Sequence, residues 1–340
     1  MFAFLRNALG LSEELPDCSH ILWQEFFCFA QQQNIAPLLV PTIARLPESQ
    51  RPPRSVWIPW LAEQNKAQNK YKTTLAAVKT ITSLLSSHGI PSFIFKGLTI
   101  SNCYPNPSLR PFSDVDIYHF GKYKEADQLL HDQLGITIVD RAQPHTQYMY
   151  KGIMFENHYS FLNLQAIPSN RDYEQLLQSL LQYPSSDIPS EYCTPNPTFT
   201  ALYMMRHIAG HFAAGGITLR HLCDWRMFLE HHSEHVDWPL VNATFAAHHM
   251  APFVDAIEGL SSFNIQPSSL NSQHSQILSS ILSPLPPHSS ESFTRLFWKI
   301  RRYNANRWKR SITCRDSECS LLFHSLTSHL RNPYTLLHRV

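Results

Sequence analysis

The sequence has little charge and almost no excess of either sign. Lysine and arginine number 28 against 26 acidic residues among 340, so the net charge is +2 and charged residues make up 16% of the chain. This balance excludes binding of nucleic acid through overall charge, and any basic partner surface must be local. The apolar share of 43% is large enough for a hydrophobic core, so we expect a folded chain.

Paired cysteines and long apolar runs are also lacking. The seven cysteines are scattered, and no Cys-x-x-Cys motif occurs, which argues against a disulfide framework or a zinc knuckle. No stretch approaches the roughly 18 uncharged apolar residues that a membrane-spanning helix needs, and the apolar run that opens the chain is too short for a signal peptide. These absences predict a soluble protein in the reducing cytoplasm.

The first half of the chain combines helical and strand patterns. Apolar residues recur at steps of three and four between Ala62 and His88, which predicts an amphipathic helix ending at Gly89. Short β-prone runs follow, separated by a helical pattern over residues 122–134. Strands are expected at 90–95, 114–118, 136–139, 146–150 and 152–164. The pattern predicts an α+β fold with a small mixed sheet and flanking helices.

The second half is expected to be helical. Helices are predicted at residues 172–182, 198–213, 218–232 and 238–258, and a Ser- and Pro-rich linker or long loop at about 264–292. We therefore expect an N-terminal helical region at 1–88, an α/β core at 89–170, a helical domain at 171–262 and a C-terminal region at 263–340.

Two aspartates two positions apart form the most informative motif. Asp114 and Asp116 lie in a run that alternates with period two, so on a strand both side chains point to the same side. Two such carboxylates can hold one hard cation, and Mg²⁺ prefers oxygen ligands. Glu156, in a later strand-like run, is the candidate third carboxylate. Taken alone, an Asp-x-Asp motif is also typical of an exposed strand end or turn.

The residues before this motif are suited to phosphate. A strand runs into Lys96-Gly97 at a helix start, where backbone N–H groups and the positive end of the helix dipole favour anions. Lys96 adds a positive charge, and Arg110 offers a two-pronged donor for a phosphate group. A proline-rich loop containing Tyr104 connects these parts to Asp114.

The order of these features resembles the nucleotidyltransferase superfamily of DNA polymerase β, and more narrowly a bacterial family of uncharacterised nucleotidyltransferases. The resemblance covers roughly residues 20–260. Its motifs are Phe95-Lys96-Gly97, Tyr104-Pro105, Leu109-Arg110-Pro111, Asp114-Val115-Asp116-Ile117, His207-x3-His211, Gly215-Gly216-Ile217 and Leu219-Arg220-x3-Asp224-Trp225.

The resemblance implies transfer of a nucleoside monophosphate from an NTP, such as ATP, to an acceptor. It implies two Mg²⁺ ions on Asp114, Asp116 and Glu156, and nucleotide contacts by Lys96, Gly97 and Arg110. The acceptor stays open between protein, small molecule and RNA, as does the oligomeric state. The superfamily usually has Gly-Ser where this chain has Lys-Gly. This departure motivates an alternative, a nucleotide-binding or interaction protein of the same fold with weak catalysis.

The remaining motif residues are expected to line the cleft or to support its structure. His207 and His211 stand four apart, a spacing that zinc accepts, but no His-Glu-x-x-His motif is present. Tyr104, Arg220 and Asp224 complete this group, and the last two form an i,i+4 pair.

Basic residues recur through 295–315 without an acidic residue and are interleaved with aromatic ones. This segment predicts an RNA-binding surface, contact with an anionic membrane, or a basic helix packed on the domain. The first of these supports a third hypothesis, an RNA-directed transferase.

Overall fold

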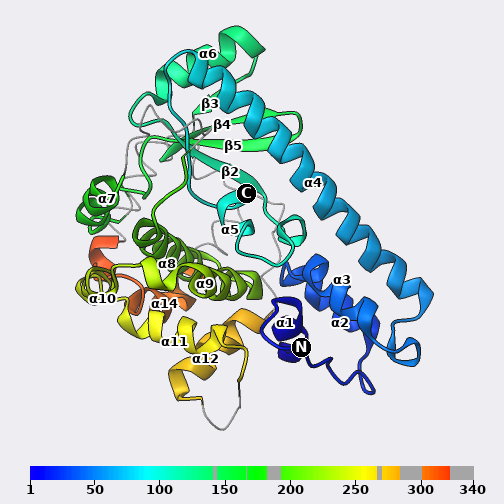
Figure 1. Ribbon diagram of the computed structural model, residues 1–340. Helices are drawn as coiled ribbons and strands as arrows, with labels where there is room; N and C mark the ends of the chain where they lie inside the picture. Colours follow the sequence, from blue (N-terminus) through cyan, green and yellow to red (C-terminus); the bar gives the residue numbers. More distant parts are fainter. Residues whose placement is uncertain (141–143, 166, 182–192, 266–269, 284–300, 322–340) are drawn as a thin grey trace.

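A computed structural model describes residues 1–140, 144–165, 167–181, 193–265, 270–283 and 301–321. These residues form one five-stranded sheet with flanking helices, set on a larger group of helices (Figure 1). The predicted fold class, a small mixed sheet in a mostly helical chain, is confirmed.

The sheet has the strand order β1-β2-β5-β4-β3. β2 and β5 run parallel, and the other neighbouring strands run antiparallel. The predicted strands are present but shorter than expected at 90–95, 136–139 and 152–164. Their bounds are β1 Phe93–Ile94, β2 Asp114–Tyr118, β3 Val139–Asp140, β4 His145–Tyr150 and β5 Ile153–His158.

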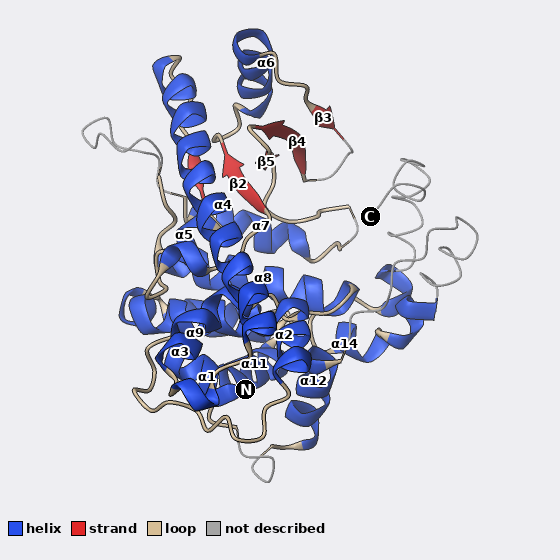
Figure 2. Ribbon diagram, turned by 90° about the vertical axis from the view of Figure 1, so that its right-hand side faces the viewer, coloured by secondary structure: helices blue, strands red, loops and turns tan. Residues whose placement is uncertain are grey.

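Helix α4 connects the two parts of the molecule. It runs over Arg54–Ser87, and its 34 residues span about 50 Å, from the N-terminal helices to the sheet (Figures 1 and 2). Its predicted start near Ala62 is too late. Trp60 is buried against rings of α2, so tertiary packing extends the helix through Pro59.

The remaining helices lie on both sides of the sheet region in the sequence, and α7, α8 and α9 are close to their predicted bounds. The N-terminal helices are α1 Phe2–Ala8, α2 Trp23–Gln32 and α3 Ala36–Arg45, and short α5 is Leu98–Ser101. α6 is Tyr123–Leu134. The helical half contains α7 Asn170–Ser179, α8 Pro197–Ala214, α9 Leu219–His232, α10 Trp238–Ala247, α11 Ala251–Ser261, α12 Ser272–Leu282 and α14 Arg307–Ser311, with single 3-10 turns at Glu48–Gln50, Pro107–Leu109 and Ser233–His235.

Two predictions for the helical half were wrong. The single helix expected at 238–258 is divided into α10 and α11. Pro252 lies in the first turn of α11, where it cannot continue a preceding helix, and His249 takes a left-handed φ of 56°. The stretch expected as a linker contains α12, because Ile277 and Ile281 are buried in the core. Residues 266–269 and 284–292 of that stretch lie outside the described residues.

Two hydrophobic clusters hold the fold together. The smaller one packs α4 and α6 against one face of the sheet, through residues such as Ile81, Leu130 and Phe155. The larger one joins α1–α3 to the helical half, so the predicted regions 1–88 and 171–262 share one core. An aromatic group around Phe161 links this larger core to the edge of the sheet.

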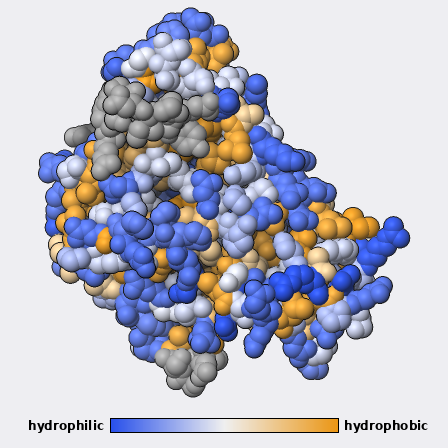
Figure 3. Space-filling view, viewed as in Figure 1, coloured by the Kyte–Doolittle hydropathy of each residue, from blue (hydrophilic) through white to orange (hydrophobic). Residues whose placement is uncertain are grey.

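The face of the molecule shown in Figure 3 carries many polar residues. Figure 3 shows hydrophobic residues in separate patches between hydrophilic ones on the face viewed. Within the described ranges, no helix is long and apolar enough to cross a membrane.

Candidate active site

One face of the sheet carries the polar side chains of three neighbouring strands. Side chains alternate along a strand, so Val115 of β2 and Phe155 of β5 enter the core beneath α4 and α6. Their neighbours therefore point to the opposite face. These are Asp114 and Asp116 of β2, Glu156 and His158 of β5, and His145 and Gln147 of β4.

The register of the strands brings three carboxylates together. Asp116 pairs directly with Glu156 across the parallel β2 and β5 strands, and Asp114 lies two residues before Asp116 on the same face. Directly opposed residues have Cβ atoms about 4.5–5.5 Å apart in an antiparallel pair, and parallel neighbours are similarly close. The structure thus places Asp114, Asp116 and Glu156 side by side, as the sequence predicted, while their metal-binding role stays a prediction.

Asp116 is the most deeply buried of these carboxylates. Its side chain is 0% exposed, and its Oδ1 atom accepts a hydrogen bond from Lys96 Nζ at 2.9 Å. His158 Nε2 lies 3.2 Å from the same oxygen. The other oxygen, Oδ2, is buried without a hydrogen-bond partner among the described residues. The Lys96 side chain is 21% exposed.

Burial and pairing compete in setting the charges here. Burial raises the pKa of Asp116, but Lys96 and His158 lower it more, so this pKa lies below its ordinary value. Burial lowers the pKa of Lys96, and Asp116 raises it more, so Lys96 stays charged. The pKa of Asp114 is raised, because burial outweighs the effect of Lys96. Asp114 therefore binds a proton more readily than Asp116.

Glu156 is surrounded by polar groups from β4 and β5. Gln147 Nε2 donates to its Oε1 atom at 3.0 Å, and His145 Nε2 lies 3.5 Å from the same oxygen. His158 Nε2 is 3.7 Å from Oε2. Burial raises the pKa of Glu156, but His158, His145 and Lys96 together lower it more, so the carboxylate is ionised at neutral pH.

Gly97 forms the turn after β1. Its φ of 61° and ψ of −90° suit glycine, and a Cβ atom there would lie 3.3 Å from the backbone oxygen of Asp114. The turn therefore brings the backbone close to the carboxylate strand. Helix α5 has only four residues, so the helix-dipole contribution expected from the sequence is that of a single turn.

Arg110 does not face the carboxylates of the sheet. It is 3% exposed, and Nε and Nη2 donate to the two oxygens of Asp224 at 2.6 and 2.8 Å, while Nη1 donates to Gly97 O at 2.9 Å. All three donor groups are thus engaged inside the protein. The predicted direct contact with a phosphate finds no support in this placement, and Arg110 instead fixes the carbonyl of the Gly97 turn.

Asp224 also accepts hydrogen bonds from the other two motif residues, Tyr104 of the proline-rich loop and Arg220 of α9. Tyr104 Oη donates to Oδ1 at 2.6 Å, and Arg220 Nη1 donates to Oδ2 at 2.7 Å. Burial raises the pKa of Asp224, but Arg110 and Arg220 lower it further, to about 2. Tyr104, Arg220 and Asp224 therefore hold one another in place, and whether they also line the cleft stays a prediction.

Helix α8 supplies a row of rings near the charged face. The rings of Tyr203, His207 and His211 lie one turn apart, with centroids 5.8 and 4.4 Å from ring to ring. Burial and the charge of Lys96 lower the pKa of His211 to about 4, and the pKa of His207 is lowered for the same reasons. Both histidines are therefore neutral at pH 7, and their role as cleft-lining or structural residues stays a prediction.

His158 and His145 were not among the predicted site residues. His158 lies two residues after Glu156, so the same alternation that pairs Asp114 with Asp116 was a usable signal. His145 is on β4 and reaches the site because it pairs with His158 in the antiparallel register. No spacing in the sequence indicates that register.

The basic C-terminal segment is partly packed where it is described. Lys309 and Arg310 are buried, with Lys309 Nζ 4.7 Å from the ring centroid of Phe212. Arg310 pairs with Glu318 at 2.8 Å, and Arg315 pairs with Asp172. The two buried residues fit the packing interpretation, whereas Arg301 and Arg307 are exposed, so the RNA-binding and membrane interpretations of 301–315 stay predictions. Residues 295–300 lie outside the described residues.

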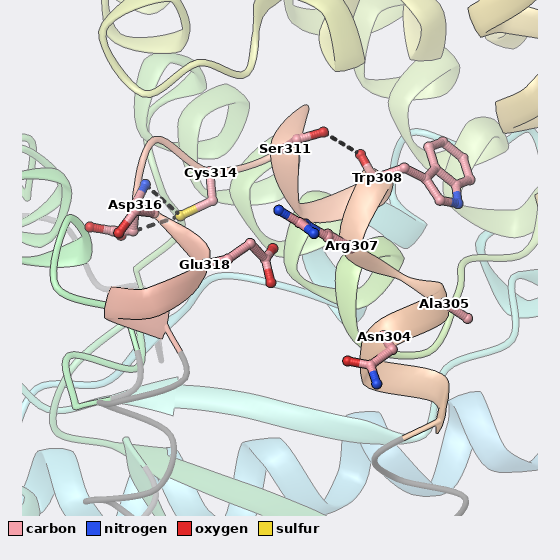
Figure 4. A pocket seen from close by; sticks show the side chains of 9 residues that line it. Asn304, Ala305, Arg307, Trp308, Ser311, Cys314, Asp316 and Glu318 are labelled. Atoms are coloured by element: carbon pink, nitrogen blue, oxygen red, sulfur yellow. Dashed lines mark hydrogen bonds between the residues drawn. The ribbon is translucent and has the colours of Figure 1, made fainter.

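A cavity of about 660 Å³ lies beside this segment, away from the sheet. Figure 4 shows its lining side chains, with Cys314 hydrogen-bonded to Asp316 at one end. All the lining residues belong to 304–318, and none is a predicted site residue.

Searches of curated proteins and of solved structures gave no match. A family model described as "uncharacterised nucleotidyltransferase" matches residues 19–260, which is more than half of the chain. The matched range contains the three carboxylates, the Lys96-Gly97 turn and the Asp224 network. The chain therefore belongs to this family of uncharacterised nucleotidyltransferases.

Proposed function

We propose that this protein transfers a nucleoside monophosphate from a Mg-bound NTP to an acceptor, at the sheet face formed by Asp114, Asp116 and Glu156. The observation that supports this most is the parallel β2–β5 register, which sets three carboxylates next to one another. Family membership supports the reaction class.

The carboxylates fit the magnesium that this reaction uses. Asp116 Oδ2 is buried and has no hydrogen-bond partner among the described residues, although a buried carboxylate oxygen normally has one. Oxygen donors suit Mg²⁺, so Asp114, Asp116 and Glu156 would hold it. When bound, two such ions lower the pKa of the acceptor hydroxyl and neutralise the leaving pyrophosphate.

The protein's own groups keep the site charged and ordered. Lys96 maintains Asp116 as a carboxylate, and its positive charge would attract a phosphate oxygen that enters the site. Gly97 allows the backbone to pass close to β2, and Arg110 anchors the Gly97 carbonyl to Asp224. Neutral His207 and His211 add no positive charge on the α8 side.

One observation favours the alternative of a nucleotide-binding protein with weak catalysis. Lys96 is paired directly with Asp116, so a cation must compete with this ammonium group for Oδ1. In that alternative, Mg-NTP binds but no acceptor is modified.

Calorimetry and pyrophosphate release test the proposal together. Each Mg-NTP is titrated into the wild-type protein, Asp114→Asn and Asp116→Asn, with Asp132→Asn as a matched control on the exposed face of α6. We expect Mg-dependent binding in the wild type and the control. Pyrophosphate release should fall by at least about 100-fold in the site variants, as when an electrostatic stabiliser is removed.

Two outcomes separate the hypotheses. Tight Mg-NTP binding without pyrophosphate release for any acceptor tested would favour the binding protein. Unchanged release by Asp116→Asn or Asp114→Asn, with circular dichroism equal to that of the wild type, would exclude this carboxylate mechanism.

A further inference from the structure

Two histidines and a glutamate converge beside the proposed nucleotide site. His145, Glu156 and His158 each offer one metal-ligating atom, and these atoms all lie within 4.8 Å of one another. Across the described ranges, no other group of three or more His, Cys, Asp or Glu side chains meets this criterion. The His207–His211 pair, which also has a zinc-compatible spacing, does not gain a third ligand there.

Hydrogen bonding assigns the ring nitrogens of His158. Its Nδ1 atom lies 3.1 Å from the backbone oxygen of Ser160, and a carbonyl only accepts, so Nδ1 carries a hydrogen. A backbone carbonyl on Nδ1 is the arrangement that orients a metal-binding histidine. The other ring nitrogen, Nε2, lies 3.2 Å from Asp116 Oδ1 and 3.7 Å from Glu156 Oε2, so it is the atom directed toward both carboxylates.

His145 approaches Glu156 from β4, with Nε2 3.5 Å from Oε1. The amide nitrogen of Gln147 lies 3.2 Å from His145 Nε2 and 3.0 Å from Glu156 Oε1. An amide NH₂ group only donates, so both atoms are acceptors, and a metal ion at Nε2 would take the place of the Gln147 hydrogen bond. Unlike that of His158, the Nδ1 atom of His145 is buried without a hydrogen-bond partner in the described part of the chain.

The histidines approach opposite oxygens of Glu156. His145 Nε2 lies 3.5 Å from Oε1, and His158 Nε2 lies 3.7 Å from Oε2. Ligands 2.1 Å from a tetrahedral zinc ion are ~3.4 Å apart, so the three ligand atoms, which lie within 4.8 Å of one another, would move closer together on coordination. A mixed nitrogen and oxygen donor set favours ions such as Zn²⁺ and Co²⁺, whereas Mg²⁺ prefers oxygen alone.

We propose that His145, Glu156 and His158 form a binding site for a divalent transition-metal ion of the zinc and cobalt class, adjoining the Asp114–Asp116 carboxylates. Any effect of this ion on nucleotide transfer rests on the proposed function. Metal binding by the cluster does not require nucleotide. The chain then distinguishes two kinds of cation on one sheet face, through imidazole nitrogens on β4 and β5 and carboxylate oxygens on β2, and Glu156 is common to both sites.

Metal titration without nucleotide tests the site. Co²⁺ binding is followed by visible absorption, and Zn²⁺ binding by calorimetry with Mg²⁺ in excess. We expect one Zn²⁺ or Co²⁺ per chain to bind in the presence of Mg²⁺, and a Co²⁺ spectrum typical of nitrogen and oxygen ligands. His145→Ala should weaken this binding by at least about tenfold, because it removes a ligand.

Two controls distinguish the cluster from other histidines. His231→Ala/His232→Ala removes a neighbouring pair at the end of α9, and His211→Ala removes one member of the α8 pair. Both should bind the metals as the wild type does. His158→Gln, which retains a polar side chain, gives a second ligand variant if His145→Ala fails to fold.

The inference is overturned if Mg²⁺ displaces Zn²⁺ at equal concentration, or if folded His145→Ala and His158→Gln bind like the wild type. It is also overturned if His211→Ala alone abolishes binding. These results are independent of transfer activity, so zinc binding without pyrophosphate release would reject the proposed function alone, and release without zinc binding would reject this inference alone.

Discussion

The carboxylate of Asp224 shows how a single residue supports the site from outside it. It accepts hydrogen bonds from Tyr104, Arg110 and Arg220, and Arg110 in turn holds the carbonyl of Gly97. Removing one partner from a buried ion pair leaves an uncompensated charge, which costs about 3–5 kcal/mol. The stability of the Gly97 turn therefore depends on a residue on α9.

We predict that Asp224→Asn has a much lower free energy of unfolding than the wild type and that this difference depends on pH. The pKa of Asp224 lies near 2 in the folded protein, below its ordinary value of 3.8, so its contribution is complete above pH 4 and is lost as the pH falls toward 2. In urea unfolding, the wild type should exceed Asp224→Asn by roughly 2 kcal/mol or more at pH 6, and the gap should shrink toward pH 2.

Asp172→Asn is the matched control, because Asp172 also pairs with an arginine but is 49% exposed. Exposed pairs contribute about 1 kcal/mol or less, so its effect should be small. A gap for Asp224→Asn that stays constant between pH 6 and 2 would contradict the assigned pKa shift.

At the scale of elements, the turn between β1 and α5 controls the approach to β2. We predict that Gly97→Ala destabilises the protein by about 1–3 kcal/mol and weakens Mg-NTP binding, because the backbone is strained and the new Cβ crowds the Asp114 carbonyl. Thermal unfolding and calorimetry measure the two effects.

Gly135→Ala provides the comparison, since Gly135 also has a positive φ, 62°, but a Cβ atom there would meet no other atom within 4 Å. It should lose about 1 kcal/mol from backbone strain without a change in nucleotide binding. Equal nucleotide binding by the two variants would show that the Gly97 turn does not shape the site.

At the scale of the whole molecule, an aromatic group joins the sheet to the helical half. Phe161 contacts the rings of Phe93 and Phe95 near the sheet edge and of Phe199 and Tyr203 on α8. The group thereby sets the distance between the carboxylate face and the α8 histidines. Its loss affects both halves at once.

We predict that Phe161→Ala lowers the free energy of unfolding by about 3–5 kcal/mol and weakens nucleotide binding by separating α8 from the sheet. Phe155→Ala, in the cluster beneath α4, should lower the free energy of unfolding by a similar amount but should change the position of α8, and hence nucleotide binding, less. Denaturant unfolding and calorimetry test both variants. A Phe161→Ala protein of wild-type stability would contradict the bridging role.

The sequence by itself determined the α+β class, the helical second half and the common side of Asp114 and Asp116, because helix and strand periodicity are local properties of the backbone. Glu156 followed from its place in a later strand-like run. The division of residues 238–258 was also visible in principle, since Pro252 interrupts that pattern.

Only the tertiary structure decided which distant residues meet. The parallel β2–β5 register places Glu156 beside Asp116, and the antiparallel β4–β5 register adds His145. Arg110 was expected to contact a phosphate, but it forms an ion pair with Asp224, 114 positions away in the chain. Such pairings depend on how strands align and on which buried charges neutralise one another, and neither is encoded in local spacing.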